Sequence, residues 1–136
     1  MHDDGLIEFL GTHRNAVLAT TRKDGRPQLS RVVAVYRDGT LWISITEGRA
    51  KYRNLVRDPR ATVMIDGDSP WQYAVISGRA AMTHIPEALP MLRTYYEAAN
   101  GPHPDWDEYD QAMRRDRRVL LQVSIDQVDH VFNVGG

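Results

Sequence analysis

The alternation of apolar and polar residues predicts a chain built mainly from β-strands. Short stretches that alternate or run apolar between turn-forming residues are typical of strands, and they cover residues 16–21, 27–36, 41–46, 61–65, 71–82 and 119–132. Helical spacing of apolar residues is seen in the remaining segments. It predicts helices at 6–10 behind Asp3 and Asp4, after Gly48, between Pro86 and Gly101, and around Trp106, Tyr109 and Met113.

Two Asp-Gly turns are expected to join the first three strands into an antiparallel meander. Lys23–Arg26 and Arg37–Thr40 each contain Asp followed by Gly, and glycine supplies the positive φ that tight hairpins require. Pro59 disfavours helical geometry in its predecessor, so the preceding helix should end at Asp58. Gly78 is expected to mark a bulge or a bend in its long strand.

The order of elements predicts one domain, 1–136, of mainly β structure with short flanking helices. Several antiparallel strands with few helices favour a closed or nearly closed barrel, because closure removes exposed sheet edges. A barrel of this size has little room inside for a large ligand. A cofactor is therefore expected on the outer wall or at a subunit boundary.

The composition is that of an ordinary soluble globule, with 42% hydrophobic and 26% charged residues. A formal net charge of −1 provides no overall field that would attract nucleic acid or an anionic membrane, so neither is expected as a partner. We see no secretory signal and no apolar run long enough to span a bilayer, and we expect a cytoplasmic protein.

The residue types exclude several kinds of chemistry. The chain has no cysteine, which excludes disulfides and thiolate chemistry. Its five histidines show no zinc-motif spacing, so no metal is assigned. The serines lack the Gly-x-Ser-x-Gly pattern of a hydrolase nucleophile.

The most informative chemistry lies at residues 44–59. A predicted strand that ends in hydroxyl side chains leads through Gly48 into a helix that begins with Arg49, Lys51 and Arg53. Free backbone N–H groups at a helix start attract anions, whereas cations there oppose the helix dipole. This pattern favours an anionic ligand such as a phosphate-bearing cofactor. A solvated basic helix would account for it equally well on local grounds.

Taken in order, several segments resemble the flavin- and deazaflavin-binding split β-barrel proteins of the pyridoxamine 5′-phosphate oxidase superfamily, and most of all their actinobacterial, F420-dependent branch. The resemblance covers nearly the whole chain. Its anchors are residues 24–30, 49–55 with 58–60, 71–75 with Gly78, and 105–109 with 117–120.

The resemblance implies an FMN-binding type of split barrel that forms a homodimer, with cofactor sites at the subunit interface. It implies that Arg49 and Lys51 hold the cofactor phosphate, with Ser44, Thr46 and Asn54 nearby. It further implies that Gln28 and Ser30 line the ring system, and that the second subunit closes the pocket with Trp71 and Tyr73.

The chain departs from the family pattern in two places. Arg31, Val32 and Val33 follow Ser30 where many relatives have proline and an aromatic residue. The Arg-x-His pair that holds pyridoxal phosphate in the true oxidase is absent from the end of the chain, which reads Asp-His-Val-Phe-Asn at 129–133. Vitamin B6 oxidation is therefore not expected.

Three functions stay open at this point. The expected one is a reductase that uses coenzyme F420 to deliver hydride to a conjugated alkene, imine or quinone-like substrate, with the proton from Tyr36, Tyr73 or water. The alternatives are an FMN-dependent oxidoreductase and a non-catalytic F420-binding or storage protein. The arginines at 114–118 either lie at the end of a helix, where cations interact favourably with the helix dipole, or bind the acidic tail of F420.

Overall fold

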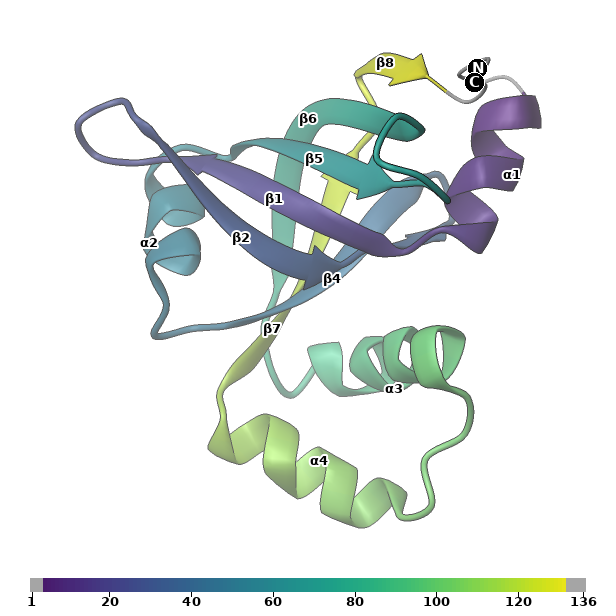
Figure 1. Ribbon diagram of the computed structural model, residues 1–136. Coiled ribbons are helices and arrows are strands. Elements are labelled where there is room, and N and C mark those ends of the chain that lie inside the picture. Colours follow the sequence, from purple (N-terminus) through teal and green to yellow (C-terminus); the bar gives the residue numbers. More distant parts are fainter. Residues whose placement is uncertain (1–3, 132–136) are drawn as a thin grey trace.

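The computed structural model describes residues 4–131. Its elements are α1 (Asp4–Thr12), β1 (Asn15–Thr21), β2 (Pro27–Val33), β3 (Val35–Arg37), β4 (Thr40–Thr46), α2 (Ala50–Arg57), β5 (Arg60–Asp66), β6 (Tyr73–Thr83), α3 (Ala88–Asn100), α4 (Trp106–Arg115), β7 (Arg118–Ser124) and β8 (Gln127–Val131). The strands curl into a barrel, and α3 and α4 lie together on one side of it (Figure 1). None of the described helices is long and apolar enough to cross a membrane.

The strand order shows how the barrel closes. Hydrogen-bonded neighbours run β2-β1-β5-β6-β7-β4-β3, all antiparallel. Because β2 and β3 are consecutive and separated only by Ala34, the two ends of this order are one stretch of chain, and the sheet returns on itself. Among the described strands no ladder joins β2 directly to β4, so the wall is split between them. The predicted antiparallel split barrel is confirmed.

Side-chain alternation divides the core into two parts. Inward residues such as Leu18, Ile43 and Ile76 are fully buried inside the barrel. Residues of the opposite parity on β4 and β7, such as Trp42 and Leu120, are buried against α3 and α4 on the outside. The helix pair therefore covers one outer wall, whereas none of the described helices covers the outer faces of β1, β2 and β5 (Figure 1).

The predicted turns and helix stops are largely confirmed. Gly25 and Gly39 have positive φ, and Asp38 joins the second turn in the left-handed region. Helix α2 ends at Arg57 with Asp58 as its cap, just before Pro59. The third helix begins later than the position of Pro86 suggested, at Ala88.

Two predicted strands are each divided in two. The strand expected over 27–36 breaks at Ala34, whose N–H donates to the carbonyl of Arg14 (2.8 Å), outside the sheet ladders. The strand expected over 119–132 breaks after Ser124, where the N–H of Asp126 turns to the carbonyl of Ser77 (3.1 Å). Phe132, the last residue of that prediction, lies outside the described residues.

The long strand expected over 71–82 begins two residues later, and Trp71 precedes it in a loop. Gln72 closes this loop, since it exchanges backbone hydrogen bonds with Gly67 (2.8 Å) and Ser69 (3.1 Å). Trp71 is therefore not part of the strand that begins at Tyr73, contrary to the prediction. Gly78 does occupy a special position, because a Cβ there would lie 1.8 Å from the carbonyl oxygen of Ser124.

Candidate functional site

The sheet register brings two cationic turns together. Thr46, the last residue of β4, pairs with Arg118, the first residue of β7. Immediately beyond that pair, the N–H of Glu47 donates to the carbonyl of Arg117 (3.0 Å). The β4–α2 turn and the α4–β7 turn, far apart in sequence, are thus neighbours. This contact joins the predicted phosphate site to the arginines at 114–118.

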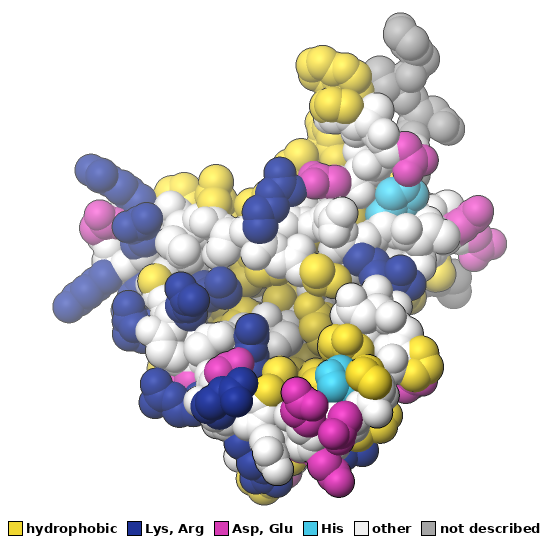
Figure 2. Space-filling model, turned by 60° about the horizontal axis from the view of Figure 1, so that its bottom comes forward, with side chains coloured by type: hydrophobic (Ala, Val, Ile, Leu, Met, Phe, Trp, Pro, Cys, Tyr) yellow, Lys and Arg dark blue, Asp and Glu magenta, His cyan; other side chains and the backbone are white. Residues whose placement is uncertain are grey.

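We call the cations at this junction the basic cluster: Arg49, Lys51, Arg114, Arg117 and Arg118. The Arg117 guanidinium lies over the β4–α2 turn, 3.4 Å from where a Cβ of Gly48 would stand. A cavity of about 290 Å³ opens here, lined by Glu47, His84, Ile85, Arg114, Arg117 and Arg118. Figure 2 shows Lys and Arg side chains gathered on one side of the molecule, beside a hollow with hydrophobic side chains.

The charge of the basic cluster is poorly compensated. Burial lowers the pKa of Lys51 below its ordinary value, and the charges of Arg49 and Arg118 lower it further. Arg118 carries a buried Nε that has no hydrogen-bond partner within residues 4–131. Helix α2 has no acidic residue in its first turn, and its N-cap residue makes no side-chain cap. Among the described residues, no ion pair engages the cluster.

Ser44 and Thr46 lie on the outer face of β4, as their positions between the buried Ile43 and Ile45 require. Their cross-strand partners are Leu120 and Arg118. The structure therefore places both predicted hydroxyls on the same wall as the Arg118 side chain, next to the helix that carries Lys51.

Asn54 and Gln28 are joined by a hydrogen-bonded network between α2 and the barrel. The buried Asn54 amide donates to the Thr20 hydroxyl (3.1 Å), which donates to Gln28 Oε1 (3.2 Å). Arg57 donates to Asn54 Oδ1 (3.0 Å) and to the carbonyl of Thr21 (2.9 Å). The network fixes α2, and with it Lys51, against β1. Arg57 therefore contributes to the contact between α2 and the barrel.

Ser30 lies two residues beyond Gln28 on the same face of β2. It pairs with Leu18, whose side chain is inside the barrel, so Ser30 also faces inward rather than onto an outer surface. Its hydroxyl is buried and has no hydrogen-bond partner in the described part of the chain. Because β2 has no ladder to β4, this unsatisfied hydroxyl belongs to the strand that borders the split. The neighbouring Arg31 points outward and pairs with Asp66 (2.7 Å).

Trp71 and Tyr73 lie at the other end of the molecule from the basic cluster. The β5–β6 loop that holds Trp71 is beside α1, whereas α2 is at the opposite end of the barrel (Figure 1). His13 ties this loop to α1 through Asp68 (2.9 Å). Trp71 is 69% exposed. Within one protomer the structure does not bring these two residues to the other predicted site residues.

A groove between β4, β7 and the helix pair was not foreseen from the sequence. Its volume is about 380 Å³, and its lining includes Ser44, Tyr95, Tyr96, His103, Tyr109 and Arg118. The Tyr95 hydroxyl donates to the carbonyl of Val33 (2.7 Å), and the Tyr109 hydroxyl donates to that of Leu92 (2.9 Å). Burial raises the pKa of Tyr109 to about 12. The helical spacing of Trp106 and Tyr109 was the available signal, and it predicts a helix but not a groove.

Comparison with known proteins agrees with this architecture. Residues 3–132 match the family model described as pyridoxamine 5′-phosphate oxidase. A conserved hypothetical protein from Mycobacterium tuberculosis is 25% identical with a TM-score of 0.78, covering 100% of this chain and 93% of its own. An F420 reductase is 23% identical (TM-score 0.72; 94% and 98% covered). A FAD-binding protein from Mesorhizobium loti is 19% identical (TM-score 0.67; 94% and 92% covered).

Proposed function

Because the chain belongs to the pyridoxamine 5′-phosphate oxidase family, we propose that it is an oxidoreductase that uses the deazaflavin coenzyme F420. In this proposal hydride passes between the reduced cofactor and a small conjugated organic substrate. The F420 reductase among the structural neighbours has the same fold, which supports the choice of cofactor.

The observation that carries the proposal is the basic cluster. Its donors are all cationic, its lysine is partly desolvated, and one guanidinium nitrogen is buried without a partner. Such a set fits a phosphate, because the anion would supply the missing hydrogen bonds and neutralise the mutual repulsion. We assign Arg49, Lys51 and Arg118 to the phosphate. Ser44 and Thr46 are the neighbouring hydroxyl donors.

The planar part of the cofactor is assigned to the split between β2 and β4. Ser30 offers an unsatisfied buried hydroxyl there, and Gln28 is held in place by Thr20. A bound deazaflavin would supply the hydride chemistry, whereas this chain's residues bind and orient it. Asn54 has its amide and its oxygen engaged by Thr20 and Arg57. Its proposed part is therefore to position Lys51.

We further assign the uncovered outer face of the barrel to a second copy of the chain. One row across this face reads Arg31, Val17, Met64 and Val75. Leu29 beside it is 63% exposed. A homodimer formed through this face would bury these apolar side chains, and it would also bring Trp71 and Tyr73 of one protomer toward the cofactor site of the other.

FMN is the second candidate cofactor. It shares the phosphate and the planar ring, and a FAD-binding protein is among the structural neighbours. The basic cluster would hold either phosphate. Titrations with F420 and with FMN, each followed by cofactor fluorescence, separate the two. Quenching by F420 alone supports the proposal, and binding of neither would refute it.

Lys51→Ala tests the phosphate assignment. A charge-assisted contact contributes about 1.5–3 kcal/mol, so F420 affinity should fall by about 10- to 100-fold. Lys23, the only other lysine in the sequence, lies exposed on the β1–β2 hairpin and provides the matched control Lys23→Ala. Equal affinity in both variants would contradict the assignment. Turnover of a conjugated enone by the reduced complex would then separate a reductase from a storage protein.

A further inference from the structure

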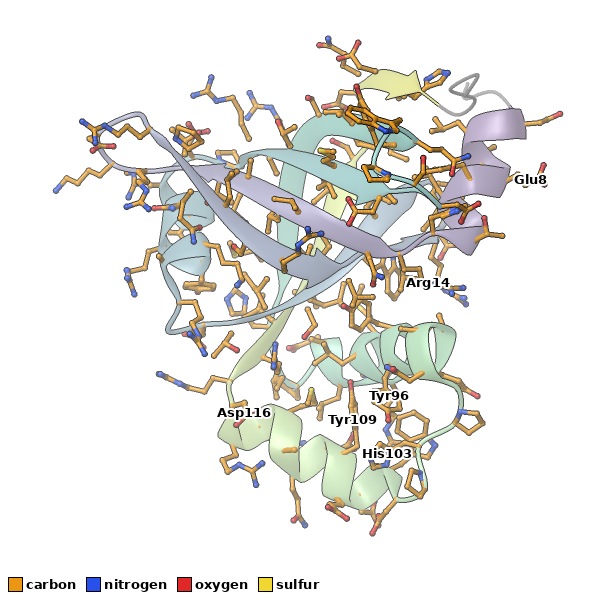
Figure 3. All side chains as sticks on the ribbon, viewed as in Figure 1. Glu8, Arg14, Tyr96, His103, Tyr109 and Asp116 are labelled. Atoms are coloured by element: carbon orange, nitrogen blue, oxygen red, sulfur yellow. The ribbon has the colours of Figure 1, made fainter. Side chains whose placement is uncertain are left out.

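Four aromatic rings pack together at the end of the groove that is far from the basic cluster, and three of them, Tyr96, His103 and Tyr109, line it. Tyr96 comes from α3, His103 from the α3–α4 loop and Tyr109 from α4 (Figure 3). The fourth ring is that of Trp106, the first residue of α4. Every pair among them has ring centroids between 5.1 and 6.0 Å apart. The rings pack on one another and leave no space for a ligand between them, so a ligand would lie in the groove against them.

His103 has a defined hydrogen-bonding polarity. The backbone N–H of Asp105 donates to His103 Nδ1 (2.9 Å), so this nitrogen acts as an acceptor and carries no proton. The neutral ring must then carry its proton on Nε2, which is a donor. No partner for Nε2 is found among the described residues. Since His103 lines the groove, it is a candidate donor to a ligand there.

The rest of the groove is preorganised and of mixed polarity. Two of its tyrosines are fixed by hydrogen bonds to backbone carbonyls, and Arg93 pairs with Asp110 (2.6 Å) to join α3 to α4. Glu108 also belongs to the lining near His103. A carboxylate at this end disfavours a second phosphate or carboxylate and is compatible with a neutral ligand.

We propose that this groove binds the substrate of the reaction, and that the substrate is an uncharged planar ring with a conjugated carbonyl. The ring packs against the aromatic wall, and the carbonyl oxygen accepts a hydrogen bond from His103 Nε2. The volume suits a bicyclic compound. The inference rests on the proposed function for calling the ligand a substrate, but the binding itself requires no cofactor.

Equilibrium dialysis with 1,4-naphthoquinone and with naphthalene tests the assignment, using the full chain without cofactor. Because the chain has no cysteine, the quinone cannot react with a thiol. We expect His103→Phe, which keeps a planar ring but removes the N–H, to weaken quinone binding about tenfold. Naphthalene binding should change less than twofold.

Ala112 lines the groove from α4, whereas its neighbour Gln111 is exposed. Ala112→Phe should therefore lower the affinity for both compounds at least about tenfold, because the phenyl ring fills the groove. Gln111→Phe should leave the affinity for both compounds unchanged. Should His103→Phe fail to fold, the wild-type protein still decides the matter. Equal affinity for quinone and naphthalene, after correction for their partition into octanol, would overturn the role of His103.

A cofactor titration of Ala112→Phe completes the test. The groove shares only Ser44 and Arg118 with the proposed phosphate site. Retained F420 or FMN affinity therefore supports a substrate groove beside the cofactor, whereas a loss of more than tenfold would assign the groove to the cofactor and overturn the inference. Absence of any naphthoquinone binding to the wild-type protein would overturn it as well. Failure of both cofactors to bind would instead refute the proposed function, and the dialysis result would be unaffected.

Discussion

Replacement of Arg118 by methionine should stabilise the ligand-free protein while it weakens anion binding. Arg118 has a buried Nε without a partner, and its charge contributes to the lowered pKa of Lys51. Both features cost stability in the absence of a ligand. A stability gain on removal of a charged residue is the opposite of what a structural ion pair would give.

The magnitude follows from opposing contributions. A buried donor without a partner costs about 1–3 kcal/mol, and relief of like-charge repulsion adds to the gain. Methionine refills most of the volume of the arginine stem, and the imperfect fit costs about 1 kcal/mol. The net gain is about 1 kcal/mol, which raises Tm by about 3 °C for a domain of this size. The lost anion contact is larger, about 1.5–3 kcal/mol.

Thermal unfolding followed by circular dichroism, with and without pyrophosphate, measures both effects. Arg118→Met should unfold at a higher temperature than wild type without the ligand and gain less from it. The difference should shrink as salt is added, because salt screens the repulsion. Arg115→Met is the control, since exposed Arg115 pairs with Asp116 in the same turn (3.6 Å). A ligand-free Arg118→Met that unfolds below wild type would refute the reasoning.

Three further predictions concern Lys51, Gly78 and Thr20. The pKa of Lys51, measured by NMR, should lie below 10.5 and should rise in the Arg118→Met variant. Because the pKa of Lys51 is lower in the folded than in the unfolded state, the free energy of unfolding should rise with pH between the folded and unfolded pKa values. An ordinary pKa for Lys51 in the folded protein would contradict this. Gly78→Ala should destabilise the protein by about 3 kcal/mol in urea titrations, because the added Cβ would lie 1.8 Å from a backbone oxygen. Gly11→Ala in α1 should instead stabilise the protein by about 0.5 kcal/mol, because no atom lies within 4 Å of the added Cβ. Thr20→Val should lower the free energy of unfolding by about 1–3 kcal/mol, because the side-chain amide of Asn54 loses its acceptor. An unchanged urea midpoint would show that the network contributes nothing to stability.

Local rules predicted the parts of the fold that local chemistry decides. The turn at Gly25 depends on the φ of one residue, and the end of α2 depends on the proline that follows Asp58. The breaks at Ala34 and Asp126 depend instead on acceptors more than ten residues away. Trp71 has the β propensity of a strand residue, but the hydrogen bonds of Gln72 place it in a loop. No pattern within a short window identifies the distant acceptors of Ala34 and Asp126.

The candidate site shows the same division. Ser44, Thr46, Arg49 and Lys51 are near one another because they are close in sequence, and their grouping could be predicted. Arg118 joins them only through the β4–β7 register. The groove likewise forms where two helices pack on the outer wall of two strands. A sequence shows which residues face that wall, but not the space left between them.

The two groups of cations differ in how far helix energetics explains them. Arg114 and Arg115 lie in the last turn of α4, where cations are favourable, and acidic residues occupy its first turn. Arg49 and Lys51 lie at the start of α2, where the dipole opposes them and no acidic residue compensates. Helix stability therefore explains the first pair and leaves the second unexplained. The formal net charge of −1 for the whole chain does not reveal this difference. A cation that is unfavourable for its own helix is a stronger indication of an anionic ligand than the number of cations in the chain.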